Sequence, residues 1–422
     1  MATLDPPRRV AITGIGVVSA GAGDVDSFWA LLLSGHSTAR RISRFDVTDC
    51  RSRIAAECDI ESAAKARSGE RDRCAVLALA AAKQAIAESA ATVDVDPPRM
   101  GVSMGTALGN TGSLQQEYCV LSGGGRAAAL DESRVGPRLY EYFTPASMAT
   151  EIACSVGAEG PTGIVATACA SGQDAVGAAA DLVRTGAADV MLAGGAEAPI
   201  SPLTIAGLDA VRTTSARNDD PEHAARPFDR TRDGFVLGEG AAVMVLEELN
   251  HALHRGAPIY AEFAGHATRC NGHSMTGLRR DGREMALAID AALRSARLTP
   301  DDVDYVNGHG SATPQSDLHE TNAYKRALGV HAYSTPISAI KPVIGHCLGA
   351  AGALEIVACA LAIDRSAIPP TANLHEPDPE CDLDYVPLTA RQRRLDVVLS
   401  TASGFGGFQS AVVLTRPNRR IP

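Results

Sequence analysis

The stretch Ile164-Val-Ala-Thr-Ala-Cys169-Ala-Ser-Gly172 joins a short β-favouring run to a helical pattern that continues to about Arg184. We predict a strand over 164–167 that turns sharply into a helix, with Cys169 at the helix N-terminus. Free backbone N–H groups and the positive end of the helix dipole stabilise a thiolate at such a position. The helix is apolar nearly all round, so we expect it to be buried. A buried helix that points a cysteine into a cleft has the geometry of a catalytic nucleophile.

A buried structural cysteine is the alternative interpretation, because free cysteine is among the most buried residue types. We assign the other nine of the ten cysteines to that role. Cys169 differs from them in its strand–cysteine–glycine–helix context. The cysteines form no CxxC pairs, which argues against a zinc site and against a disulfide framework.

Short β-rich runs alternate with longer helical patterns along the whole chain, which predicts an α/β architecture. We expect strands at 10–14, 101–105, 164–167, 190–193, 241–246, 259–264, 303–306, 336–340, 397–400 and 411–414. We expect helices at 74–90, 171–184, 283–297, 348–363 and in a segment that ends at Leu328, before Gly329. No linker interrupts the chain. We therefore predict two similar halves, 1–250 with Cys169 and 251–422 with the candidate basic residues described next.

Two of the eleven histidines have the context of catalytic groups. His309 and His346 each follow a predicted strand and lie beside glycine, and catalytic groups of α/β folds gather at the carboxyl ends of strands. His36, His251, His254, His331 and His375 lack that context and are assigned to the surface. His319 lies in Asp317-Leu-His-Glu320, where a metal site is the weaker alternative because no second ligand pair accompanies it.

Two further segments carry candidate site residues. Lys341 follows a predicted strand, and we expect it to form a buried ion pair with Glu320 rather than to be a solvated charge. Ser403-Gly-Phe405-Gly-Gly-Phe-Gln409 lies between two predicted strands. It is either a plain glycine-rich hairpin or a turn whose backbone N–H completes an oxyanion hole, with Phe405 as a gate over the cysteine.

Composition excludes several classes of function. The 422 residues are 45% hydrophobic and 21% charged, with a formal net charge of −10, which is typical of a globular domain. No basic block with interleaved aromatic residues is present, so we expect no nucleic-acid partner. No signal-peptide core or membrane-length apolar run is present, so we expect a cytoplasmic protein without membrane contact. Gly14-Ile-Gly16 lacks the third glycine of a dinucleotide loop.

These motifs together resemble the β-ketoacyl-ACP synthase family over essentially the whole chain. The residues that carry the resemblance are Thr-Ala-Cys169-Ala-Ser-Gly, His309-Gly-Ser-Ala-Thr-Pro, Lys341, Gly-His346-Cys-Leu-Gly-Ala-Ala-Gly and Gly404-Phe-Gly-Gly407. The family's fold is the thiolase fold, in which two related halves form a five-layered α/β/α/β/α structure. Arg226–Ala241, Pro379–Leu388 and Gly404–Ala411 are similar to the catalytic (alpha) ketosynthase of bacterial type II polyketide synthases.

The resemblance implies a decarboxylative Claisen condensation of acyl and malonyl thioesters on an acyl carrier protein. Cys169 would take the acyl chain, His309 and His346 would hold the malonyl thioester oxygen, and Lys341 and Glu320 would support them. Backbone N–H groups of Cys169 and Phe405 would form the oxyanion hole. Ser311 and Thr313 would contact the phosphopantetheine, which the carrier brings, so that no cofactor or metal of the chain's own is needed.

The resemblance also implies a heterodimer with a homologous chain-length factor, which usually lacks the cysteine. A second copy of this chain is the other partner left open. Cys169 argues against this chain being the chain-length factor itself, and the two histidines with Lys341 argue against a degradative thiolase.

Some residues depart from the pattern of aromatic-polyketide ketosynthases. They are Ala168, Ala170, Ala312, Pro314, Ser316 and Pro342, together with the fatty-acid-like Gly194-Gly-Ala-Glu197 and Gly352. From them we expect a linear, reduced or polyene product. An aromatic polyketide ketosynthase and a fatty-acid-type β-ketoacyl-ACP synthase II are the alternatives.

Overall fold

The first strand of each half lies at the centre of one ten-stranded sheet, in the order β11-β10-β14-β15-β9-β1-β8-β6-β4-β5. The structure is a computed structural model that describes residues 8–59, 71–91, 95–126 and 130–417. The first seven residues, where we expect no signal peptide, lie outside the described residues. Only two residue pairs, Ala11–Glu262 and Ile12–Ala261, join β1 to β9, so the two halves of the sheet meet along a short seam.

The two half-sheets have matching strand orders around this seam. The N-terminal half contains β1 (Val10–Ser19), β4 (Met100–Gly105), β5 (Thr162–Val165), β6 (Val190–Glu197) and β8 (Gly240–Glu248). The C-terminal half contains β9 (Ala261–Cys270), β10 (Tyr305–Asn307), β11 (Ile337–Ser338), β14 (Val397–Gly404) and β15 (Phe408–Thr415). Two small sheets accompany them, formed by β2 (Arg40–Arg41), β3 (Ile54–Ala56) and β7 (Leu237–Gly238), and by β12 (Ala367–Ile368) and β13 (Arg391–Gln392).

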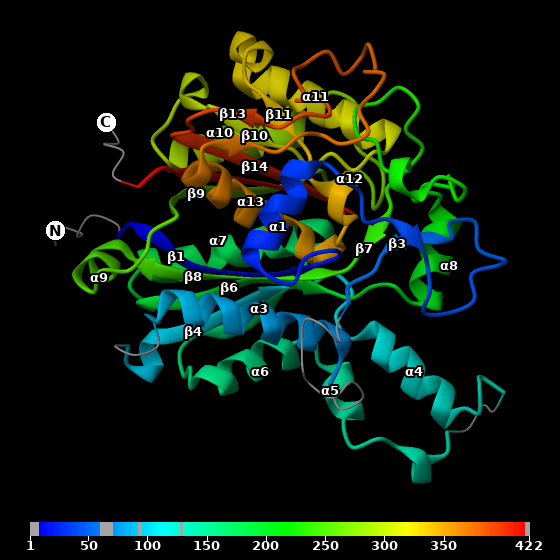
Figure 1. Ribbon diagram of the computed structural model, residues 1–422. Coiled ribbons are helices and arrows are strands. Elements are labelled where there is room, and N and C mark those ends of the chain that lie inside the picture. The colour runs from blue at the N-terminus through cyan, green and yellow to red at the C-terminus, as the bar shows by residue number, and fades with distance from the viewer. Residues whose placement is uncertain (1–7, 60–70, 92–94, 127–129, 418–422) are drawn as a thin grey trace.

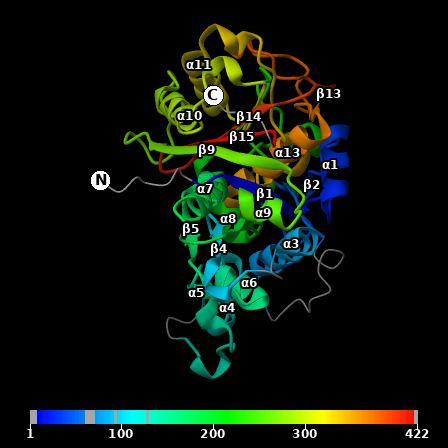
Figure 2. The same cartoon turned by 90° about the vertical axis from the view of Figure 1, so that its left-hand side faces the viewer.

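Helices form the three other layers, as the two views of the ribbon show (Figures 1 and 2). Helices α3 (Arg73–Ser89) and α6 (Ser147–Val156) cover the outer face of the N-terminal half-sheet. Helices α7 (Ser171–Arg184) and α13 (Ala351–Arg365) lie between the half-sheets, and α10 (Arg283–Ser295) and α11 (Pro314–Leu328) lie outside the C-terminal one. The order is α/β/α/β/α, which confirms the expected five-layered thiolase fold.

The remaining helices lie around these layers. They are α1 (Val25–Ser34), α4 (Thr111–Leu121), α5 (Leu139–Phe143), α8 (Pro202–Val211), α9 (Leu249–His254) and α12 (Lys341–Ile344). Helix α9 connects β8 to β9, and for that reason we propose the boundary between the halves near residue 250. Within the described ranges, no helix combines the length and the hydropathy that a membrane crossing requires.

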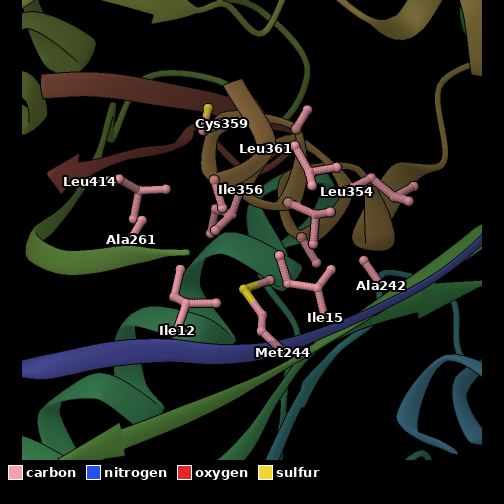
Figure 3. Packing of buried hydrophobic residues seen from close by; sticks show 14 of the residues in the cluster. Ile12, Ile15, Ala242, Met244, Ala261, Leu354, Ile356, Cys359, Leu361 and Leu414 are labelled. Carbon is pink, nitrogen blue, oxygen red and sulfur yellow. The ribbon is translucent and has the colours of Figure 1, made fainter. Parts of the chain in front are cut away.

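The largest apolar core fills the space between the half-sheets. Figure 3 shows Ile12, Ile15 and Met244 from β1 and β8 facing Leu354 and Ile356 of α13. These side chains are all fully buried or nearly so. Because α13 is buried on all sides, its sequence is apolar all round, as expected for the segment 348–363.

Three expectations need correction. The predicted strand 336–340 is only Ile337–Ser338, because the chain turns at Lys341 into the short helix α12. The predicted helix 348–363 begins with a 3₁₀ turn over Leu348–Ala350 before α13. The nine other cysteines are not uniformly buried, since Cys119, Cys154 and Cys270 are exposed.

The two central helices approach each other at a pair of equivalent glycines. Gly172 and Gly352 are each the second residue of their helix. A Cβ at Gly172 would lie 2.8 Å from the Gly349 carbonyl oxygen and 2.9 Å from the Ala353 nitrogen. A Cβ at Gly352 would lie 2.7 Å from the Gln173 Cβ. Only glycine therefore allows this backbone-to-backbone contact.

We expect Gly172→Ala to lower the free energy of unfolding by about 1–3 kcal/mol, because the added methyl group meets backbone atoms that cannot rotate away. Gly207→Ala in the exposed helix α8 is the matched control, since no atom lies within 4 Å of a Cβ there. The control should stabilise by about 0.5–1 kcal/mol through helix propensity. Denaturant unfolding of both variants measures the difference, and equal midpoints would contradict the close-packing argument.

Candidate active site

Cys169 lies in a tight turn between β5 and α7. The strand ends at Val165, a 3₁₀ turn spans Ala168–Ala170, and α7 begins at Ser171. The Ser171 hydroxyl accepts a hydrogen bond from the Thr167 N–H at 2.9 Å and donates one to the Ala168 carbonyl at 2.6 Å. Ala168 adopts a left-handed conformation with φ 51°. These contacts hold Cys169 at the start of a buried helix, as the sequence predicts.

The second half repeats this turn at the start of α13. Leu348, the first residue of the 3₁₀ turn, also has a positive φ of 39°, and Gly349 occupies the position equivalent to Cys169. The N-termini of both central helices therefore meet at one place. His346 precedes this second turn, and its backbone is hydrogen-bonded to Val236 at 2.7 Å and to Gly238 at 3.0 Å.

One cavity of about 260 Å³ lies at this meeting point. Six of the candidate site residues line it, namely Cys169, His309, Ser311, Thr313, His346 and Phe405. Apolar and polar residues that the sequence analysis did not select complete the lining, among them Leu208, Phe235, Met275, Leu278 and Leu348. Lys341 and Glu320 are buried behind the lining residues and do not face the cavity.

The two histidine rings lie close together and nearly perpendicular. Their centroids are 5.4 Å apart at an interplanar angle of 83°, and the Phe235 ring packs edge-on against His346 at 5.0 Å. Burial lowers the pKa of both His309 and His346 well below the usual value, and the Lys341 charge lowers each pKa further. Both rings are therefore neutral near pH 7, and a neutral imidazole can donate one hydrogen bond.

The expected Lys341–Glu320 ion pair is wrong. The Lys341 ammonium is paired with Glu355 of α13 and donates to the His309 carbonyl, and it lies 3.4 Å from His309 Nδ1. Burial raises the pKa of Glu355 to about 7, against the opposing effect of Lys341. Glu355 has a sequence signal, because it is the single charged residue in the apolar segment 348–363.

Glu320 instead positions the loop that carries His309. Its carboxylate accepts hydrogen bonds from the backbone N–H groups of His309 at 2.5 Å and Gly310 at 2.8 Å. Tyr324 and Thr401 donate to the same carboxylate at 2.5 Å and 3.3 Å. Glu320 therefore supports a catalytic loop through its backbone rather than through Lys341.

Phe405 lies at the tip of the β14–β15 hairpin, which pairs from Val397–Thr415 to Gly404–Phe408. Gly406 and Gly407 have φ of 89° and 83°, which only glycine adopts readily. The Phe405 N–H is hydrogen-bonded to the Cys169 thiol, which lowers the pKa of that thiol. The segment is therefore both a glycine-rich hairpin and a turn whose N–H points at the nucleophile.

Ser311 and Thr313 form the side of the cavity at the start of α11. Their hydroxyl oxygens are 3.2 Å apart, and the Thr313 hydroxyl caps α11 by accepting from the Ser316 N–H at 3.3 Å. His319, the weaker metal candidate, faces away from the cavity and contacts the Arg279 carbonyl at 2.5 Å. Among the described residues, no group of three or more His, Cys, Asp or Glu side chains could hold a metal ion.

Burial dominates the electrostatics of Cys169. It raises the pKa of the thiol to about 12, against the Lys341 charge and the Phe405 N–H, which lower it. The expectation of a helix-stabilised thiolate is therefore wrong for the free protein, because desolvation outweighs the helix N-terminus. A buried cysteine, two neutral histidines and a convergent backbone N–H in this fold define an acyltransferase of the thiolase type.

Comparisons with known proteins give the family. Residues 7–252 match the N-terminal domain of β-ketoacyl synthases, and residues 260–375 match the C-terminal domain. The chain belongs to the β-ketoacyl synthase family and is an acyltransferase.

The similar proteins include full-length relatives. The chain is 57% identical to the oxytetracycline polyketide putative β-ketoacyl synthase 1 of Streptomyces rimosus, over 100% of both chains. It is 54% identical to the tetracenomycin polyketide synthase ketoacyl synthase alpha subunit of Streptomyces glaucescens, over 97% of both. A solved type II polyketide synthase acyl-carrier protein complex with its ketosynthase bound to the hexaketide matches with a TM-score of 0.92 and 35% identity, over 98% and 100% of the chains.

We expect the rate at which iodoacetamide alkylates Cys169 to rise by about tenfold per pH unit from about pH 7 to about pH 10. The raised thiol pKa keeps the thiolate fraction small throughout that range, so the profile should show no plateau. Intact-protein mass spectrometry measures the adduct, with Cys169→Ala giving the background from the exposed cysteines. A plateau below about pH 9 would show a thiolate stabilised more strongly than its burial allows.

Proposed function

We propose that this chain is the catalytic ketosynthase (alpha) subunit of a type II polyketide synthase that assembles an aromatic polyketide. It would condense acyl and malonyl thioesters carried by an acyl carrier protein. The observation that carries the proposal is the convergence of Cys169, two neutral histidines and the Phe405 N–H on one cavity. The full-length similarity to the oxytetracycline and tetracenomycin proteins supports the type II assignment.

The earlier expectation of a reduced or polyene product is not supported. The oxytetracycline and tetracenomycin relatives favour the aromatic alternative. The residues that differ from the aromatic-polyketide pattern do not indicate the product, because most of them have a role in the backbone conformation. Ala168 and Ala312 occupy left-handed turn positions with φ 51° and 63°. Ala170 and Pro342 are buried in helix starts. Pro314 lines the cavity, but it is also the first residue of α11, a position that proline favours.

In the proposed mechanism, acyl transfer precedes condensation. The Cys169 sulfur attacks the acyl thioester that the carrier presents. The pantetheine sulfur of the carrier is the leaving group, and it takes up the proton that the Cys169 thiol loses. Malonyl-carrier protein then enters with its pantetheine against Ser311 and Thr313. The chain would need no cofactor of its own, because the carrier brings the phosphopantetheine.

His309 and His346 would stabilise the enolate that forms as malonyl loses CO₂. Donors placed at a developing oxyanion contribute roughly 2.7–4 kcal/mol each. The enolate carbon attacks the Cys169 thioester carbonyl, and the backbone N–H groups of Cys169 and Phe405 hold the tetrahedral oxyanion. This attack forms the carbon–carbon bond, and collapse of the tetrahedral intermediate breaks the carbon–sulfur bond and releases the Cys169 thiolate, which takes up a proton from water. Lys341, held by Glu355, would keep the His309 carbonyl in place, and its charge would help to keep both histidines neutral.

A group of exposed apolar side chains supports a protein partner. Helices α4 and α5 project from the lower end of the body in both views (Figures 1 and 2). Exposed apolar side chains gather there, with Tyr140 80% exposed; the others are Leu108, Tyr118, Val120, Leu130, Val135 and Phe143. Exposed patches of this kind mark interfaces. We propose that a chain-length factor covers this surface, and that the active form of the enzyme is a cytoplasmic heterodimer.

The proposed roles predict that different variants stop different steps. Cys169→Ala should abolish the acyl adduct, because it removes the sulfur. His309→Ala and His346→Ala should still load acyl chains but lose malonyl decarboxylation by about 100-fold or more, because the enolate loses a donor. Intact-protein mass spectrometry measures loading, and CO₂ release measures decarboxylation. An adduct of undiminished yield on Cys169→Ala would reject the nucleophile.

Reconstitution tests the product and the partner together. The chain with a chain-length factor, acyl carrier protein and malonyl thioester should build an unreduced poly-β-ketone, observed on the carrier by mass spectrometry. The chain alone should elongate poorly, because its apolar surface is uncovered. Elongation of enoyl or saturated chains in preference to β-ketoacyl chains would reject the aromatic assignment. Full elongation by this chain without a partner would reject the heterodimer.

A further inference from the structure

A further buried carboxylate, Glu197, lies close enough to Cys169 for its charge to affect the thiol, and it has no role in the mechanism above. It is the last residue of β6, at the carboxyl end that faces the central helix N-termini, and it is fully buried. Four neutral groups donate to it. They are the Thr106 hydroxyl at 2.9 Å and the backbone N–H groups of Ala107 at 2.6 Å, Leu108 at 3.2 Å and Gly349 at 3.0 Å.

These donors come from two separate segments that flank Cys169. Ala107 follows β4, and Gly349 belongs to the turn before α13. Both segments contribute to the apolar cluster around Cys169, through Ala107 and Leu348. The segments touch directly, since a Cβ at Gly349 would lie 2.2 Å from the Ala107 nitrogen and 2.6 Å from the Glu197 carboxylate.

Glu320 shows the same chemistry in the other half, where it accepts from the two consecutive N–H groups of His309 and Gly310. Each half thus has a buried carboxylate that holds the loop after one of two equivalent strands, β4 in the N-terminal half and β10 in the C-terminal half. In the C-terminal half that loop carries a histidine of the cavity. In the N-terminal half it carries no polar catalytic group, and its side chains at 107 and 108 are apolar.

We propose that Glu197 is a positioning residue for the acyl chain, holding the wall formed by residues 106–108 against Leu348 and Gly349 next to Cys169. The inference rests on the proposed function, because an acyl chain bound to Cys169 must lie along the apolar cluster that these segments form. Leu108 is 37% exposed at the surface where the partner is proposed, so the same wall extends from the nucleophile to the interface.

His346 does not depend on this carboxylate. Its backbone is held separately by Val236 and Gly238. Loss of Glu197 should therefore disturb the acyl wall and spare malonyl decarboxylation. A purely structural role for Glu197 would affect both activities together.

The test compares Glu197→Gln with Glu247→Gln in the complex with the partner subunit. In Glu197→Gln an NH₂ group replaces one carboxylate oxygen. That group cannot accept hydrogen bonds from the donors that surround Glu197. Glu247 is an equally buried carboxylate on the neighbouring strand β8, bound to Thr13, His251 and Arg255, far from the cavity lining. Acetyl, hexanoyl and decanoyl carrier proteins are the loading substrates, and malonyl-carrier protein is the decarboxylation substrate.

We expect Glu197→Gln to lower kcat/KM for decanoyl loading by roughly 10- to 100-fold, because displaced positioning groups reduce rates by that order. Acetyl loading and malonyl decarboxylation should change by less than about threefold, since their groups are held independently. If Glu197→Gln does not fold, Thr106→Val takes its place in the test. It removes one of the four donors, and it should lower kcat/KM for decanoyl loading by a smaller factor. Glu247→Gln should leave the decanoyl-to-acetyl ratio unchanged.

An equal loss for all acyl lengths, an unchanged decanoyl rate, or the same length-dependent loss in Glu247→Gln would overturn the inference. These outcomes are distinct from a failure of the proposed function, which would appear as a wild-type protein that does not decarboxylate malonyl-carrier protein.

Discussion

The close contact of α7 and α13 at Gly172 and Gly352 is the constraint on which the rest of the structure depends. It lets two helix N-termini meet between the half-sheets, and each N-terminus follows a 3₁₀ turn that begins with a positive-φ residue. One turn carries Cys169, and the other follows His346. The nucleophile and both histidines line one cavity of about 260 Å³ at this meeting point.

Burial then determines the charge states in that cavity. Desolvation lowers the pKa of both histidines and raises those of Cys169 and Glu355, while Lys341 opposes the shifts of the two acids. The result is a site of neutral donors around a thiol, with one buried ion pair behind it. Such a site suits a reaction whose charge develops only in the transition state, because preorganised donors are most effective where water is excluded.

Much of the fold could be predicted from local patterns. The segments around 171–184, 283–297 and 411–414 have the periodicity of the elements that form there, and Cys169, His309 and His346 stand next to glycines after strands. The Lys341–Glu355 pair could not be predicted, because a lone glutamate in an apolar helix gives no signal of which distant lysine it contacts. Ala168 and Ala312 do not indicate the product, because both occupy left-handed positions in turns.

The sequence by itself determined the α/β class and the approximate position of the main strands and helices. It also determined which cysteine stands at a helix start and the family to which its motifs are similar. These properties depend on neighbours within a few residues, so local spacing records them. Only the tertiary structure decided that Lys341 pairs with Glu355, that Glu320 holds the His309 backbone, and that Glu197 joins residues 106–108 to Gly349. Those contacts arise where the two half-sheets fold onto the central helices, which brings residues far apart in the chain within hydrogen-bond distance.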